Sequence, residues 1–224
     1  MKIKAIITGV TGMVGEGVLH ECLNHPDVES VLMVNRKPFG VKHEKLTEIV
    51  HKDFFNLTEI EDQFAGYNAC YFCAGVSSVG KKEDEYRHLT YDMTLNFANT
   101  LLKVNGEQSR SITFCYISGV GTDSSEKGRS MWARVKGKTE NDLMKLPFKN
   151  SYAFRPGYIQ PTKGLKNTYR LYKFLAPFYP IVKTLIPKYA TTLREIGLAM
   201  INVSISGSDK KVLECKDIVR LSKN

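Results

Sequence analysis

The sequence predicts an α/β fold in which a doubly wound parallel sheet is covered by helices on both faces. Short apolar runs rich in β-branched residues alternate with longer amphipathic segments, and a glycine-rich turn joins the first run to the first helix. A chain of 224 residues suffices for one well-buried domain and is too short for two of ordinary size. We therefore expect residues 1–224 to form a single domain.

The elements can be placed in chain order from the apolar runs and the amphipathic segments between them. The predicted strands are residues 3–8, 30–34, 48–51, 69–74, 112–117 and 151–154, with a short seventh at 211–214. The predicted helices are residues 13–24, 57–64, 83–104, 130–145 and 193–203. Residues 161–190 are proline-rich and fit neither pattern, so we expect a small C-terminal elaboration there.

Composition and charge narrow the class of protein. The formal net charge of +9 comes from one region, because ten basic residues and no acidic one lie between Asp142 and Glu195. No apolar stretch approaches the ~20 residues that span a bilayer, and the N-terminal residues lack the features of a secretory signal peptide. These features predict a cytoplasmic protein.

Cysteine usage predicts free thiols. The five cysteines are an odd number without framework spacing: Cys22, Cys70, Cys73, Cys115 and Cys215. Cys70 and Cys73 form a Cys-x-x-Cys pair inside a predicted strand, where their side chains point to opposite faces of the sheet. No second pair completes a zinc site, so we expect buried structural thiols and no metal.

The strongest motif joins the first strand to the first helix. Residues 8–15, here called the glycine turn, comprise Thr8, Gly9, Val10, Thr11, Gly12, Met13, Val14 and Gly15. Gly9 permits the tight turn, Gly12 lets the backbone approach a pyrophosphate, and Gly15 lets the helix pack close to the strand. This strand, turn and helix predict a Rossmann-type dinucleotide site.

The end of the second strand indicates which dinucleotide is bound. In such folds an acidic residue about 20 residues beyond the glycines accepts hydrogen bonds from the ribose of NAD. This chain has Asn35, Arg36 and Lys37 instead. A guanidinium can hold the 2'-phosphate of NADP, which a carboxylate would repel. NADP(H) is therefore expected in preference to NAD(H), although a solvated Arg-Lys pair is the alternative interpretation.

An ordered set of motifs resembles the atypical short-chain dehydrogenases/reductases, in the NAD(P)H-binding group of the epimerase/dehydratase-like superfamily. The matching pieces cover most of residues 1–160; they are the glycine turn, Asn35-Arg36-Lys37, Cys73-Ala74-Gly75, Ile117-Ser118-Gly119-Val120-Gly121, Val135-Lys136-Gly137-Lys138-Thr139-Glu140 and Phe154-Arg155-Pro156-Gly157. The resemblance implies that Asp53 lies beside the adenine, that Ala74 and Gly75 pass under the cofactor, and that Lys136 binds the nicotinamide ribose. Arg155 and Pro156 belong to the same implied cofactor site.

One position departs from that family. Its Tyr-x-x-x-Lys pair uses a tyrosine as proton donor, and the lysine lowers the tyrosine pKa. Trp132 stands four residues before Lys136, and an indole N–H is not a usable acid. Lys136 and Ser118 are thus the remaining candidate catalytic residues. Ser118 ends the fifth strand, where its alternative role is to satisfy backbone groups.

These observations support two functions of different classes. The first is an NADP(H)-dependent reductase of a small carbonyl, quinone or flavin-type substrate that lacks the usual tyrosine, since the cofactor carries the harder chemistry. The alternative is a dinucleotide-binding redox sensor resembling the NmrA-like regulators. A sugar-nucleotide epimerase or dehydratase ranks third, because only 68 residues follow Pro156. We expect a monomer or homodimer.

The basic, aromatic-rich residues 163–189 suggest further partners. Their first interpretation is a static cover of broken helices whose lysine stems lie over apolar surface. A lid over the cofactor site is the alternative, and its charge would favour an acidic small-molecule substrate. Membrane-surface docking is less favoured because prolines break the segment, and nucleic acid is not expected because no binding motif accompanies the charge.

Overall fold

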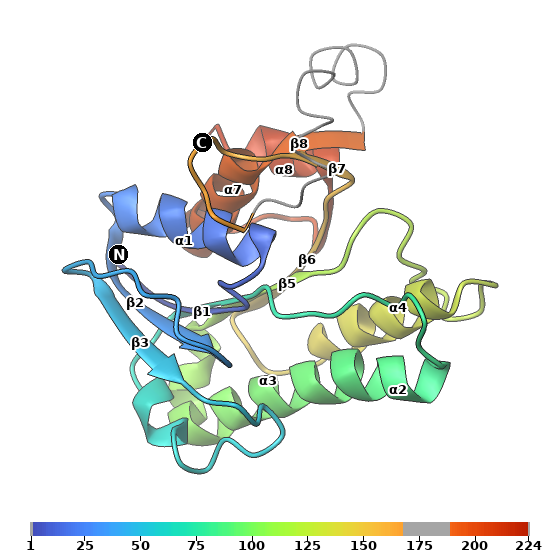
Figure 1. The fold of residues 1–224 in the computed structure, drawn as a ribbon, viewed down its shortest axis with the longest axis horizontal. Helices are drawn as coiled ribbons and strands as arrows, with labels where there is room; N and C mark the ends of the chain where they lie inside the picture. Colours follow the sequence, from blue (N-terminus) through green and yellow to red (C-terminus); the bar gives the residue numbers. More distant parts are fainter. Residues whose placement is uncertain (1, 168–188, 224) are drawn as a thin grey trace.

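The computed structural model describes residues 2–167 and 189–223, and its centre is a parallel sheet of seven strands (Figure 1). The strands are β1 (Ile3–Thr8), β2 (Val28–Asn35), β3 (Leu46–Val50), β4 (Ala69–Phe72), β5 (Thr113–Ile117), β6 (Asn150–Arg155) and β9 (Val212–Glu214). Their order is β3-β2-β1-β4-β5-β6-β9, and every neighbouring pair is parallel. The order reverses between β1 and β4, where ligands of such sheets bind at the carboxyl ends of the strands.

Helices cover both faces of this sheet. Figure 1 shows α1 (Met13–Asn24), α7 (Leu193–Ser206) and α8 (Cys215–Leu221) on one face. The opposite face carries α2 (Glu83–Arg87), α3 (Met93–Asn105) and α4 (Met131–Leu143). Because parallel strands are buried on both sides, the apolar core divides into two clusters, one under each helical layer. The predicted doubly wound α/β fold is confirmed.

Several predicted boundaries agree with the structure. β1 and α1 have the predicted bounds, since a buried apolar strand followed by a glycine turn leaves little freedom in register. The seventh strand is present as β9. Cys70 packs in the cluster under α3, whereas Cys73 follows β4 and packs against the other cluster, so the two thiols do face opposite ways.

Other predicted elements are wrong in extent. Residues 57–64 form only a short 3₁₀ helix, Glu61–Phe64, because the preceding residues turn around the side chain of Asn56, which accepts a hydrogen bond from the Thr58 amide. The predicted helix at 83–104 is divided by a π-helical segment, His88–Asp92. A π turn adds one residue per turn, which a search for 3.6-residue periodicity does not detect.

The C-terminal part contains elements that the sequence patterns did not predict. Besides α8, a separate two-stranded parallel sheet joins β7 (Tyr158–Gln160) to β8 (Ala190–Thr192). Residues 168–188, most of the predicted elaboration, lie outside the described residues. Within the described part of the chain, no helix is long and apolar enough to cross a membrane, and no group of His, Cys, Asp or Glu could hold a metal ion.

Candidate functional site

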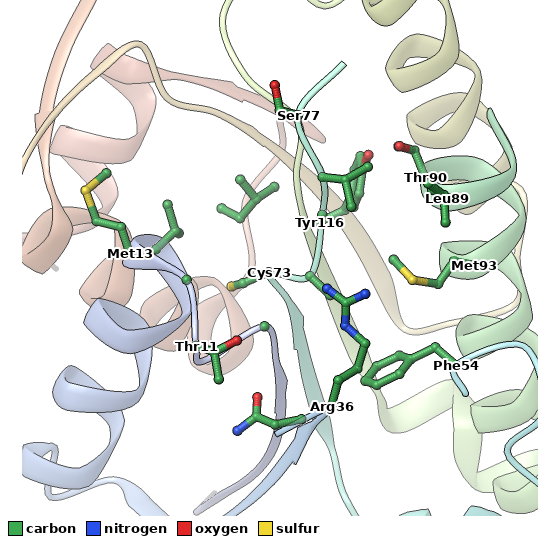
Figure 2. A pocket seen from close by; sticks show the side chains of 18 of the residues that line it. Thr11, Met13, Arg36, Phe54, Cys73, Ser77, Leu89, Thr90, Met93 and Tyr116 are labelled. Atoms are coloured by element: carbon green, nitrogen blue, oxygen red, sulfur yellow. The ribbon is translucent and has the colours of Figure 1, made fainter. Parts of the chain in front are cut away.

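A cavity of about 490 Å³ opens at the carboxyl ends of the central strands, where the strand order reverses (Figure 2). One side of it comes from the glycine turn, the carboxyl end of β2 with Arg36, the segment that follows β4, and the carboxyl end of β5; the lining residues from these parts include Gly9, Thr11, Gly12, Met13, Val14, Asn35, Arg36, Cys73, Ala74, Gly75, Tyr116 and Ile117. Lys136 of α4 and residues of α2 and the π segment complete the wall. Most of the predicted cofactor residues therefore meet in one place.

The glycine turn is shaped by two close backbone approaches. Gly9 has φ +71°, and a Cβ there would lie 2.6 Å from the amide nitrogen of Ala74. A Cβ on Gly15 would lie 2.3 Å from the carbonyl oxygen of Gly9. A Cβ on Gly12 would meet only that same oxygen, at 3.3 Å. Gly9 and Gly15 thus hold β1, β4 and α1 together, and Gly12 leaves room on the cavity side.

Two observations show that this turn fits a dinucleotide. Helix α1 begins at Met13, and the residue before it, Gly12, provides no side-chain cap, so the amides of the first turn are open to an anion. Beside it, Asn35 is 1% exposed; its Oδ1 accepts a hydrogen bond from the Val10 amide at 3.1 Å, and its Nδ2 has no partner among the described residues. Because buried polar groups are usually hydrogen-bonded, this unpaired Nδ2 donor suits a polar ligand.

Arg36 places a free cation at the end of β2. Figure 2 shows its side chain reaching from that strand end into the cavity beside Phe54. Among the described residues no carboxylate lies within ion-pair distance of its guanidinium. The guanidinium can therefore meet a bound phosphate without first breaking an ion pair.

Six predicted cofactor residues do not line the cavity; they are Thr8, Gly15, Lys37, Asp53, Arg155 and Pro156. The hydroxyl of buried Thr8 accepts a hydrogen bond from the Ala74 amide at 3.2 Å and so joins the ends of β1 and β4. Asp53 is exposed and accepts a hydrogen bond from the Phe55 amide at 2.9 Å, while its neighbour Phe54 lines the cavity. Lys37 is exposed and does not line it.

Lys136 is the one lysine among the described residues that line the cavity. Its Nζ donates a hydrogen bond to the carbonyl oxygen of Ser118 at the end of β5. Burial lowers the pKa of Lys136 to about 8, and the charge of Glu140, one helical turn further along α4, acts in the opposite direction. The predicted lysine therefore lines the site, and burial destabilises its charged form.

Ser118 and Trp132 are placed differently from the lysine. Ser118 is buried, and its hydroxyl donates to the carbonyl oxygen of Phe154 at 3.1 Å, so it satisfies a backbone group as the alternative interpretation expected. Trp132 is not among the residues that line the cavity; its ring lies 3.4 Å from the position that a Cβ on Gly121 would take. Neither side chain supplies a proton donor to the cavity.

The cofactor role implied for Arg155 and Pro156 does not match their positions. The Arg155 guanidinium is turned away from the cavity, toward Glu140, Glu214 and the hydroxyl of Ser124. Pro156 is buried, and its carbonyl oxygen accepts a hydrogen bond from the Val120 amide at 3.0 Å. Both residues contact the loop after β5 instead, Arg155 through Ser124 and Pro156 through Val120. The Arg155 guanidinium turns this way because a buried guanidinium pairs with the nearest carboxylates.

Sequence reasoning missed the wall opposite the glycine turn. It is formed by Leu89 and Thr90 of the π segment and by Met93 of α3 (Figure 2). Tyr86 of α2 also lines the cavity. Tyr116 of β5 also lines the cavity; burial raises its pKa, and so do Tyr86 and Glu140 nearby. The only signal in the sequence was the aromatic and apolar periodicity of residues 83–104, which is also what a core helix shows.

Comparison with known proteins identifies the family of this chain and several similar proteins. Residues 5–129 match the model of the NAD dependent epimerase/dehydratase family. The FMP52 protein of Debaryomyces hansenii is 26% identical over 172 residues, which cover 74% of this chain and 72% of that protein. The resemblance inferred from the motifs is confirmed by this match.

Solved structures share the fold at low sequence identity. Uronate dehydrogenase from Agrobacterium tumefaciens superposes with a TM-score of 0.65 at 13% identity, covering 94% of this chain and 75% of its own. A short chain dehydrogenase family protein from Francisella tularensis gives a TM-score of 0.65 at 14% identity, covering 93% of each chain. These structures support the Rossmann-type assignment.

The expected cytoplasmic location is wrong by the same comparison. The FMP52 relatives of Debaryomyces hansenii and Candida albicans are named as mitochondrial proteins, which points away from the cytoplasm. The expectation rested on absent features, and an absent feature does not identify a compartment.

Proposed function

The chain belongs to the NAD-dependent epimerase/dehydratase family, and on this premise we propose that it is an NADP(H)-dependent reductase of a small carbonyl, quinone or flavin-type substrate. The family supplies the coarser statement, an NAD(P)-binding, oxidoreductase-like fold. The choice of NADP(H) and the reductase activity are the proposal.

One observation carries the cofactor choice. The cavity wall at the end of β2 presents the guanidinium of Arg36, which no described carboxylate pairs with, where an NAD-specific protein would present an acid. A guanidinium binds a phosphate with paired, charge-assisted hydrogen bonds. The 2'-phosphate distinguishes NADP(H) from NAD(H), so this position is expected to set the preference.

The other lining residues have complementary roles in this proposal. The open amides of α1 would hold the pyrophosphate, and Asn35 would offer its unpartnered Nδ2 to the ligand. Lys136 would orient the nicotinamide end from the opposite side of the cavity. When bound, the dinucleotide supplies a hydride. Tyr86, Leu89 and Met93 would exclude water from the substrate side.

A competing function is a redox sensor that binds the dinucleotide without turnover. It is favoured by the absence of the family's tyrosine, since Trp132 does not line the cavity and the Ser118 hydroxyl is used by the Phe154 carbonyl. The two functions share the cofactor site and differ only in catalysis. They are therefore separated by turnover and not by binding.

Calorimetric titration of NADPH and NADH tests the cofactor assignment. The wild-type protein should bind NADPH more tightly, and Arg36→Asp should lose about 10-fold to 100-fold of NADPH affinity, since a hydrogen bond to a charged group contributes about 1.5–3 kcal/mol. Arg110→Asp is the matched control, because Arg110 is an exposed cation outside the cavity that pairs with Glu107. Equal affinities for both dinucleotides in the wild type would contradict the assignment.

Turnover assays separate reductase from sensor. NADPH oxidation is followed at saturating protein with 9,10-phenanthrenequinone, a small aldehyde panel and free FMN. Steady consumption with any of these supports the reductase. Tight NADPH binding without consumption across the panel supports the sensor and contradicts the reductase.

A further inference from the structure

The cavity lacks the two proton donors that the motif pattern would have supplied. Trp132 occupies the tyrosine position and does not line the cavity, and an indole N–H does not act as an acid. The Ser118 hydroxyl is buried against the Phe154 carbonyl. A reductase built on this cavity must take its proton from another group.

Lys136 is held in a position to provide it. Lys136 lines the cavity, and its Nζ donates one hydrogen bond to the Ser118 carbonyl oxygen, which leaves two of the three ammonium N–H groups for other acceptors. No described carboxylate lies within ion-pair distance of this Nζ. The ammonium is therefore tethered without being neutralised.

The carboxylate nearest in sequence is engaged elsewhere. Glu140 lies one turn along α4 from Lys136, and its side chain is fully buried. Both of its oxygens bind the Arg155 guanidinium, which also meets Glu214 of β9. Glu140 is thus paired with Arg155, and it affects the pKa of Lys136 by its charge without forming an ion pair with the ammonium.

We propose that Lys136 is itself the proton donor of the reaction, delivering an ammonium proton to the substrate oxygen as the substrate carbon receives a hydride from the reduced nicotinamide dinucleotide. This inference rests on the proposed reductase function. The N–H bond of Lys136 breaks and an O–H bond forms, the carbonyl is reduced to an alcohol and the dinucleotide is oxidised. The neutral amine then regains a proton from water.

The charged and titratable groups around Lys136 are consistent with this role. Burial lowers the pKa of Lys136 to about 8, close to neutral pH, where a general acid is most effective. The other charged or titratable side chains that line the cavity are Arg36 after β2, Tyr116 of β5, Tyr86 of α2 and, after β4, Cys73. Burial raises the pKa of Tyr116, Tyr86 and Cys73. They are weaker acids at neutral pH than the lysine.

Two variants of Lys136 separate its charge from its acidity. Lys136→Arg keeps a cation that can hold the dinucleotide, but a guanidinium does not release a proton near neutral pH. Lys136→Met removes both properties. Lys138→Met is the matched control on the same helix, because Lys138 bonds to Asp142 outside the cavity.

The first readout is kcat against pH together with NADPH affinity. Lys136→Arg should retain NADPH binding by calorimetry and lose about 10²-fold to 10⁴-fold in kcat, the usual contribution of a general acid. Wild-type kcat should fall as pH rises through about 8. Added alkylamines should restore turnover in Lys136→Met, with rates that follow the pKa of the amine, which a merely structural lysine would not show.

The second readout needs no turnover. Competitive acetylation of Lys136, followed by mass spectrometry of its peptide with N-acetyl-lysine amide as the reference, measures its pKa in the unliganded protein. A midpoint near 8 supports the proposal, and a midpoint near 10.5, the ordinary lysine value, overturns it.

The outcomes distinguish this inference from the proposed function. Wild-type turnover that Lys136→Arg retains with an unchanged pH profile would overturn the lysine's role while leaving the reductase intact. Loss of turnover in Tyr86→Phe or Tyr116→Phe, with amine rescue absent in Lys136→Met, would likewise assign the proton to a tyrosine. No wild-type turnover with any substrate would overturn the reductase and this inference together.

Discussion

The guanidinium of Arg155 and the carboxylate of Glu140 form a two-point ion pair between β6 and α4. Arg155 Nε lies 3.0 Å from Glu140 Oε1, and Nη2 donates to the second carboxylate oxygen. The Glu140 side chain has no exposed surface. The pair joins β6 to α4, the helix that carries Lys136. It therefore helps to position Lys136, although neither Arg155 nor Glu140 lines the cavity.

Breaking this pair should cost stability and leave cofactor affinity nearly unchanged. Arg155→Met leaves the buried Glu140 charge uncompensated, for which the expected loss is about 3–5 kcal/mol in the free energy of unfolding. Urea unfolding at pH 7 measures it. Arg134→Met is the control: it removes an ion pair with Glu83 at the protein surface, for which about 1 kcal/mol or less is expected. A large loss of NADPH affinity at unchanged stability would instead restore Arg155 to the cofactor site.

The glycines of the turn should respond differently to alanine. Gly15→Ala places a Cβ 2.3 Å from the Gly9 carbonyl oxygen, so the helix must move; an overpacking cost of about 1–3 kcal/mol or more is expected, with loss of NADPH binding. Gly12→Ala meets only a 3.3 Å contact and should be much milder in stability. Thermal unfolding of both variants decides the point, and equal destabilisation would show that the turn relaxes.

Replacing Lys136 should change the pH dependence of stability. The folded-state pKa of about 8 lies below the ordinary 10.5, so the folded protein releases this proton first and the unfolded chain binds more protons between those values. Wild-type stability should therefore rise, relative to Lys136→Met, as pH increases from about 8 to about 10.5. Urea unfolding of both proteins at several pH values gives the difference. A difference that stays flat across this range would show that the lysine is not destabilised by burial.

Glu16 should hold the segment at 166–167 against the glycine turn. Its buried carboxylate accepts hydrogen bonds from the amides of Lys166 at 2.7 Å and Asn167 at 2.6 Å. Glu16→Gln replaces one acceptor by a donor, so about 1–3 kcal/mol of local stability is expected to be lost. Hydrogen exchange by mass spectrometry should then speed up at those amides.

The control for that experiment is Glu29→Gln, because Glu29 is exposed and pairs with Lys4. Its exchange at residues 166–167 should match the wild type. Unchanged exchange in Glu16→Gln would show that this segment is held by other contacts, such as the packing of Leu165 on the core.

The part of the site that local chain geometry controls could be predicted from the sequence. β1, the glycine turn and α1 are adjacent in the chain. Glycine at position 9 indicates a positive φ, and glycine at position 15 indicates close packing of the helix on the turn, as the structure has them. The same holds for Arg36, because a residue directly after a strand of a parallel sheet lies at the carboxyl edge whatever its partners are.

Only the tertiary structure decided which way the longer polar side chains turn. Arg155 ends β6 as Arg36 directly follows β2, yet its guanidinium turns away from the cavity because α4 brings a buried carboxylate to it from 15 residues away. The Ser118 hydroxyl turns to the carbonyl oxygen of Phe154 on the neighbouring strand, which also accepts from the Ser118 amide, since a buried hydroxyl needs an acceptor. Sequence thus determined where the backbone opens a dinucleotide site, whereas the direction of each polar side chain depended on charges and carbonyls that only folding brings within hydrogen-bond distance.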